Sequence, residues 1–80
     1  MHSGQYQIFR EMLVQARKNS GLTQEIIAKE LGKPQSYLSK FECGERRLDF
    51  TEFIDIANII GLDIDRFIKA YQKQAKKVIR

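Results

Sequence analysis

Glycine and proline divide the sequence into segments of helical length. The internal breaks stand at Gly21, Gly32, Pro34, Gly44 and Gly61. Between them, apolar residues recur with the spacing of one helix face, and no stretch shows the period-two alternation of a β-strand. The sequence therefore predicts an all-α fold of five helices, in which each break ends one helix before the next begins.

The expected helices have clear start signals. Thr23, Asp49 and Asp63 are residue types that commonly cap helix N-termini, and Asp49 forms a capping-box pattern with Glu52. The apolar residues that follow the Asp49 cap are Phe50, Phe53, Ile54, Ala57 and Ile60. We expect the helices to cover roughly residues 5–18, 24–31, 34–43, 49–60 and 63–80.

Length and composition describe one small domain covering residues 1–80. The chain has 80 residues, of which 42% are hydrophobic, and a formal net charge of +4. Its single cysteine cannot close an internal disulfide, and its start does not resemble an export signal, so we expect a reducing cytoplasm. The apolar runs are far shorter than the roughly 20 residues that cross a bilayer as a helix, so we expect no contact with a membrane.

Charge is distributed unevenly along the chain. Residues 1–47 carry eight basic and five acidic side chains, residues 48–68 carry one and five, and residues 69–80 carry five and none. A basic face favours a polyanionic partner such as nucleic acid. The alternative is ordinary solubility, because many soluble domains have a similar balance. Charge alone leaves these two interpretations open.

Residues 24–43 match the helix-turn-helix pattern. Two short helices are joined by a short turn at Gly32, and Ala28 is small where the second of them must cross the first closely. The apolar residues that close the angle between the two helices are Ile27, Leu31, Leu38 and Phe41. Each of these constraints has a steric reason, so chance agreement is a poor explanation.

Further motifs extend the pattern over residues 13–64. They are Arg17 before a Gly-Leu-Thr-Gln start, Leu31-Gly32, a Gln-Ser opening of the third helix, Glu42-x-Gly44, a basic pair and an Ile-Gly-Leu-Asp end. In these features the chain resembles the lambda-repressor-like (Xre/Cro) helix-turn-helix family. The resemblance implies a compact five-helix domain that binds operator DNA, usually as a symmetric dimer. The chain departs from the family at three positions. Lys33 stands where the family often has an apolar residue, Leu48 where proline is common, and Ile26 where the residue is usually polar.

The third helix is expected to read DNA bases. Only the major groove presents a distinct donor and acceptor pattern for each base pair, and it admits one helix. The side chains not needed for the core are Gln35, Ser36, Tyr37, Ser39 and Lys40. The Gln35 amide suits adenine, and Lys40 can donate to guanine. Tyr37 either contacts a thymine methyl or a phosphate, or packs on the surface of its own domain.

Other residues are expected to position the domain on the phosphate backbone. Gln24 opens the second helix, where free N–H groups and the helix dipole favour an anion, and by resemblance it also supports Gln35. The resemblance places Arg46 and Arg47 in a loop that contacts phosphates, the alternative being a solvated charge pair. It also implies a structural ion pair between Arg17 and Glu42.

The last helix, residues 63–80, is longer than a minimal domain requires. Its apolar stripe favours a second subunit as cover, so we expect a homodimer on a palindromic site. The interface residues that we favour are Tyr71, Ala75 and Val78, the alternative being a frayed helix end. The basic residues of this segment either reach DNA flanks or form a solvated face.

Catalysis and metal binding find little support in the sequence. His2 is isolated near one end, and Cys43 has no second thiol or nearby histidine, so we expect no enzyme, no metal site and no cofactor. The competing hypothesis is a protein-interaction module, such as an antitoxin that binds a protein partner and binds DNA secondarily. The sequence leaves that alternative open.

Overall fold

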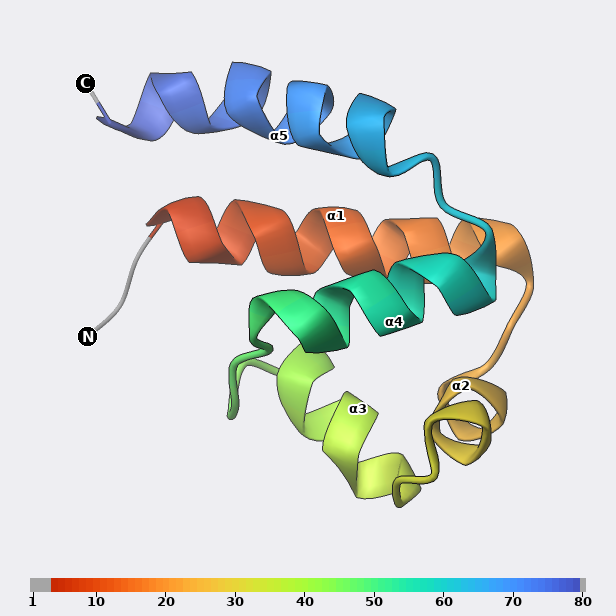
Figure 1. Cartoon of the computed structure of the whole chain (residues 1–80). Helices are drawn as coiled ribbons and strands as arrows, with labels where there is room; N and C mark the ends of the chain where they lie inside the picture. Colours follow the sequence, from red (N-terminus) through yellow and green to blue (C-terminus); the bar gives the residue numbers. More distant parts are fainter. Residues whose placement is uncertain (1–3, 80) are drawn as a thin grey trace.

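The computed structural model describes the backbone of residues 4–79 and the side chains of residues 4–76. Within these residues the chain forms five α-helices and no strand (Figure 1). The helices are α1 (Gly4–Ser20), α2 (Gln24–Leu31), α3 (Gln35–Glu42), α4 (Phe50–Ile60) and α5 (Ile64–Ile79). The all-α prediction is therefore confirmed, and α1 extends slightly beyond the expected bounds at both ends.

The predicted caps define the helix starts. The Thr23 hydroxyl accepts a hydrogen bond from the Ile26 N–H at 3.1 Å. Asp49 and Glu52 form the complete capping box at the start of α4, with each side chain bound to the other residue's backbone N–H. Gly32 ends α2 with a φ of 70°, in the left-handed region that glycine adopts without strain. The breaks seen in the sequence are thus the physical ends of the helices.

One apolar cluster joins all five helices. It includes Leu13 of α1, Ile27 of α2, Phe41 of α3, Ile56 of α4 and Phe67 of α5. Around it, aromatic rings of α1, α3, α4 and α5 meet edge to face, with ring centroids 5.3–6.4 Å apart. Helix α5 packs along α1, while α2 and α3 project together on the opposite side of α4 (Figure 1). This arrangement leaves α3 on an open face of the molecule.

The apolar residues that follow the Asp49 cap do not all point inward. Leu48 and Phe53 flank the cap and are both buried, as in a hydrophobic staple. Phe50, the first residue of α4, is 71% exposed. The staple fixes the direction in which α4 begins, and Phe50 then falls outside the core.

No helix within residues 4–79 has the length and the continuous apolar character that crossing a membrane requires.

Candidate nucleic-acid interface

Helix α3 divides its side chains between the core and the surface. Leu38 is 2% exposed and Phe41 is fully buried, and these two residues fix the rotation of the helix. The side chains that this rotation leaves exposed are those of Gln35, Ser36 and Lys40. Ser39 is half-buried, and its hydroxyl donates to the carbonyl of Ser36 at 3.3 Å. Four of the five predicted base-reading residues therefore lie on or at the edge of one open helix face.

Tyr37, the fifth predicted base-reading residue, is half-buried and engaged by its own domain. The Arg46 guanidinium lies 4.3 Å from the ring centroid and the Lys33 ammonium lies 5.2 Å from it. The tyrosine hydroxyl also interacts with the Glu52 carboxylate of α4. Burial first, and then the nearby Glu52 carboxylate, raise the pKa of Tyr37 to about 12. Of the two roles predicted for Tyr37, the geometry favours packing of its ring on the surface of its own domain over contact with DNA.

Arg46 is held by the start of α4. Its Nη2 lies 3.3 Å from Oε2 of Glu52, and the other carboxylate oxygen of Glu52, Oε1, accepts the Asp49 backbone N–H at 2.9 Å. Burial alone would raise the pKa of Glu52, but the hydrogen bond from the Asp49 N–H, the nearby Tyr37 hydroxyl and Arg46 lower it below its ordinary value. Glu52 therefore ties the loop after α3 to both α3 and α4.

Arg47 lies on the other side of the same loop. Its side chain is exposed, and its guanidinium lies 4.4 Å from the ring centroid of Tyr6 in α1. The Tyr6 hydroxyl accepts a hydrogen bond from the Leu48 N–H at 2.7 Å. The two arginines of the predicted phosphate-binding pair therefore point to different neighbours, Arg46 to α3 and α4, and Arg47 to α1.

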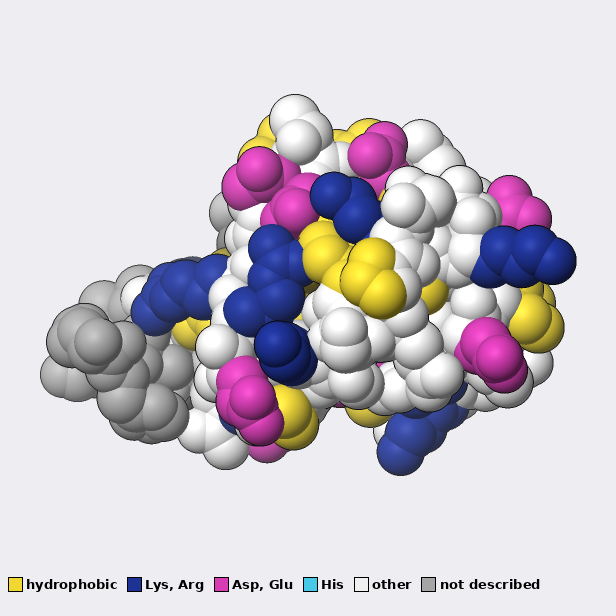
Figure 2. Space-filling model, turned by 90° about the horizontal axis from the view of Figure 1, so that it is seen from below, with side chains coloured by type: hydrophobic (Ala, Val, Ile, Leu, Met, Phe, Trp, Pro, Cys, Tyr) yellow, Lys and Arg dark blue, Asp and Glu magenta, His cyan; other side chains and the backbone are white. Residues whose placement is uncertain are grey.

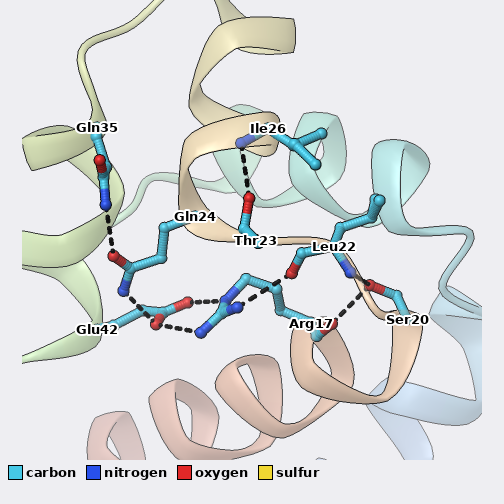
Figure 3. Close-up of polar contacts among 8 residues, drawn as sticks. All are labelled: Arg17, Ser20, Leu22, Thr23, Gln24, Ile26, Gln35 and Glu42. Carbon is cyan, nitrogen blue, oxygen red and sulfur yellow. Dashed lines mark hydrogen bonds and ion pairs between the residues drawn. The ribbon is translucent and has the colours of Figure 1, made fainter.

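A polar network connects the ends of three helices (Figure 3). Arg17 Nε and Nη2 donate to the two carboxylate oxygens of Glu42 at 2.7 and 3.0 Å, and Arg17 Nη1 donates to the Leu22 carbonyl at 3.0 Å. The Arg17 and Glu42 side chains are only 14% and 10% exposed. The ion pair expected between these residues is thus present in bidentate form and largely shielded from water.

The same network reaches the exposed end of α3. The Gln24 amide nitrogen donates to Glu42 at 2.7 Å, and the Gln24 amide oxygen accepts from Gln35 Nε2 at 3.5 Å (Figure 3). The second contact is long for a hydrogen bond, so it orients the Gln35 amide without locking it. Gln24 thus supports Gln35, the contact that the resemblance implied.

Positive charge gathers on the face that carries α3. Figure 2 views the molecule from the α2 and α3 side, where Lys and Arg side chains form a band next to apolar atoms. The exposed or partly exposed cations in and around α3 are Lys33, Lys40, Arg46 and Arg47. Since Lys33 and Arg46 both lie against the ring of Tyr37, this aromatic residue helps to hold cations from the two turns that flank α3.

The residues predicted for a dimer interface lie on α5 and have different surroundings. Tyr71 is half-buried, whereas Ala75 is 3% exposed within the single chain. Ala75 therefore offers almost no surface to a second copy, contrary to the expectation for this position. Val78 lies outside the side chains that the structure describes, as do Lys77 and Arg80 of the basic tail, and His2 lies outside its described residues altogether.

Sequence reasoning assigned Glu52 only to the helix cap and missed its contacts with Tyr37 and Arg46. Fifteen positions separate Tyr37 from Glu52 in the sequence, and no local spacing rule connects them. Only the packing of α3 against the loop and α4 brings these groups together. Among the described residues, no three His, Cys, Asp or Glu side chains form a group that could hold a metal ion.

The crossed pair of α2 and α3, with the exposed polar face of α3, defines a helix-turn-helix domain. The family model described as "Helix-turn-helix" matches residues 13–67, and the chain belongs to this family, in its Xre-like branch of DNA-binding transcriptional regulators.

Two similar proteins support this assignment. The chain is 33% identical over 78 residues to an uncharacterized HTH-type transcriptional regulator, YqaE, of Bacillus subtilis (strain 168), with 90% of this chain and 67% of the relative covered. A solved structure, described as an XRE-family like protein from Pseudomonas syringae pv. tomato str. DC3000, matches with a TM-score of 0.81 and 40% identity. That match covers 88% of this chain and 85% of the other.

Proposed function

We propose that this protein is a sequence-specific regulator that binds double-stranded DNA in the cytoplasm, with α3 in the major groove and as a symmetric dimer on a palindromic operator. The observation that carries the proposal is the division of α3, in which Leu38 and Phe41 are buried while Gln35, Ser36 and Lys40 are exposed. A helix fixed in this way presents the same side chains to every duplex that it meets. The HTH-type regulator of Bacillus subtilis supports the regulatory role.

The exposed side chains suit different contacts. The Gln35 amide can pair with N6 and N7 of adenine, and Lys40 can donate to O6 or N7 of guanine, while Ser36 and Ser39 are weaker readers. Because the ring of Tyr37 is half-buried between cations of its own domain, we assign Tyr37 to holding the cations of this face, with contact to a thymine methyl or a phosphate as its other role.

Phosphate contacts would fix the register of the domain on the duplex. Arg46 and Arg47 lie in the loop that follows α3, and the N-terminus of α2 at Gln24 offers free backbone N–H groups to a phosphate. Before DNA binds, the contact with Glu52 holds the Arg46 side chain beside α3. In the complex, Arg46 would divide its guanidinium between Glu52 and a phosphate.

The test is a selection on random duplexes with purified protein, followed by binding measurements across a salt series. Wild-type protein is expected to bind a selected sequence with an affinity that falls steeply with salt. Gln35→Ala should change the selected sequence, whereas Arg46→Ala should weaken all duplexes alike. The reverse pattern would overturn the role assignment. Failure of the pure protein to bind any duplex would favour the protein-interaction module instead.

A further inference from the structure

Lys33 lies in the turn between α2 and α3, at a position where the chain departs from its family. Its backbone is held on both sides, since the Lys33 N–H donates to the Ala28 carbonyl at 2.9 Å and Pro34 follows with a φ of −69°. Its side chain is exposed. The turn therefore presents a cation from a fixed point just before α3.

The Lys33 side chain meets a second cation at one aromatic ring. Its ammonium lies 5.2 Å from the ring centroid of Tyr37, and the Arg46 guanidinium lies 4.3 Å from the same centroid. The backbone after α3 folds back toward the helix, because the N–H groups of Glu45 and Arg46 both donate to the Lys40 carbonyl, at 2.8 and 3.3 Å. Two cations that are 13 positions apart in the sequence are thus brought together beside the first turn of α3.

The two cations differ in their counter-ions. Arg46 Nη2 lies 3.3 Å from Glu52, so its charge is balanced at the start of α4. Among the side chains of residues 4–76, no carboxylate forms an ion pair with Lys33. The two positive charges can be no farther apart than the sum of their distances to the Tyr37 centroid, so they repel each other. A bound anion would offset this repulsion.

The ring of Tyr37 prepares Lys33 for such an anion. A lysine ammonium has three N–H donors, and its contact with a ring face leaves donors for a ligand. A lysine side chain loses rotamer freedom when it binds a ligand, and one that is already held over a ring loses less. Tyr37 is half-buried and also in contact with Arg46, so the ring is a fixed support.

The chemistry of the anion follows from the place of this cluster in the fold. Lys33 precedes Gln35, the first residue of α3, by two positions. The Lys and Arg side chains on this side of the molecule form a band (Figure 2). An anion bound by Lys33 would therefore adjoin the base pairs that α3 reads, and the anions beside the bases of a duplex are backbone phosphates.

We propose that Lys33 binds a backbone phosphate of the DNA, and that Tyr37 is the positioning residue that holds Lys33 and Arg46 on the same stretch of backbone. The inference rests on the proposed function and deepens it, because it adds a phosphate contact before α3 to those in the loop after it. Such a contact fixes the register of α3 in the groove and reads no sequence itself.

The salt dependence of DNA affinity tests the role of Lys33. Each phosphate contact contributes about 0.9 to the slope of log K against log salt concentration. Fluorescence anisotropy of the selected duplex gives this slope for the full chain. Lys33→Ala should reduce the slope by about 0.9, so its disadvantage against wild type should shrink about 3.5-fold between 50 and 200 mM salt. The sequence selected from random duplexes should stay the same.

The matched control is Lys69→Ala. It removes the same charge from an exposed position of α5, which packs along α1 and lies across α4 from α3 (Figure 1). We expect this variant to keep the wild-type slope. An equal reduction in both variants would show a long-range effect of net charge and would overturn the proposed contact.

Two variants of Tyr37 test the positioning role in a double-mutant cycle with Lys33→Ala. Tyr37→Leu removes the aromatic face, so the loss of affinity caused by Lys33→Ala should be at least about twofold smaller in that background. Tyr37→Phe keeps the ring and should preserve the full loss. A merely structural role of Tyr37 would lower affinity to the same extent with or without Lys33. Circular dichroism checks that each variant is folded, and Tyr37→Phe with Lys33→Ala still tests the phosphate contact if Tyr37→Leu is not.

The failure of this inference differs from the failure of the proposed function. An unchanged slope for Lys33→Ala refutes the phosphate contact, and a changed selected sequence shows that Lys33 reads a base instead. Equal losses from Lys33→Ala with and without the Tyr37 ring refute the positioning role. Each of these results leaves DNA recognition intact, because wild-type protein still binds its duplex. A wild-type chain that binds no duplex refutes the proposed function, and the DNA contact of Lys33 with it.

Discussion

Replacing Arg17 tests how much stability the shielded ion pair contributes. Arg17→Ala removes two hydrogen bonds to Glu42 and one to the Leu22 carbonyl. It leaves the Glu42 carboxylate, whose side chain is 10% exposed, with Gln24 as its remaining donor. Removing one partner of a buried pair costs about 3–5 kcal/mol, against under about 1 kcal/mol for an exposed pair. Because this pair is largely shielded, we expect a loss near the lower end of the larger range.

That loss is a large share of the total stability. A domain of this size has a free energy of unfolding of roughly 4–12 kcal/mol, at about 0.05–0.15 kcal/mol per residue. Urea unfolding followed by far-ultraviolet circular dichroism gives the change in free energy directly. The melting temperature should fall by more than about 10 °C, since each kcal/mol shifts it by about 4–8 °C in a small domain.

Three further variants make the test specific. Lys18→Ala removes an exposed cation from the same helix and should change stability by less than about 0.5 kcal/mol. Arg17→Lys keeps the charge but loses the bidentate geometry, so an intermediate loss is expected. The double variant Arg17→Met, Glu42→Leu leaves no charge stranded and should recover most of the stability. A loss under about 1 kcal/mol for Arg17→Ala would show that water screens the pair and would refute the reasoning.

Two further predictions concern the cluster around Glu52. The folded-state pKa of Tyr37 is raised to about 12. The protonated Tyr37 hydroxyl therefore contributes its full stabilisation below pH 10.0, the ordinary pKa, and this stabilisation is lost as the pH rises from there toward 12. Absorbance at 295 nm should show one late-titrating tyrosine, absent in Tyr37→Phe, and no late component in wild type would contradict this. The folded-state pKa of Glu52 is lowered from 4.5, so its contribution is present above that pH and lost as the pH falls. Glu52→Gln should therefore cost about 1 kcal/mol at pH 7, and less in acid, while the exposed control Asp55→Asn costs almost nothing. Equal losses for Glu52→Gln at pH 7 and pH 3 would refute the assignment.

Local features of the sequence predict most of the fold. The caps at Thr23 and Asp49 and the left-handed turn at Gly32 depend on neighbouring residues alone, so the pattern of residues shows them directly. The division of α3 into buried Leu38 and Phe41 and an exposed polar face follows from the helical period. The pair between Arg17 and Glu42 needed the family resemblance, because the sequence separates these residues by 25 positions.

The remaining features depend on packing between distant segments. An apolar stripe on α5 does not indicate which neighbour covers each position, so the burial of Ala75 within its own chain was not predictable. The exposure of Phe50 depends on the staple between Leu48 and Phe53, which uses the residues on either side of the cap and leaves the first helical position outside. Apolar periodicity predicts which residues share a face, and the packing partners decide whether that face is covered.

The loop between α3 and α4 carries both arginines that we assign to phosphate contact. Arg46 contacts Tyr37 on the side of α3, whereas Arg47 lies over Tyr6 of α1. The capping box at Asp49 and Glu52 fixes the end of this loop rigidly to α4. Arg46 and Arg47 are therefore held by different helices, so replacing one of them should weaken phosphate contact without displacing the other.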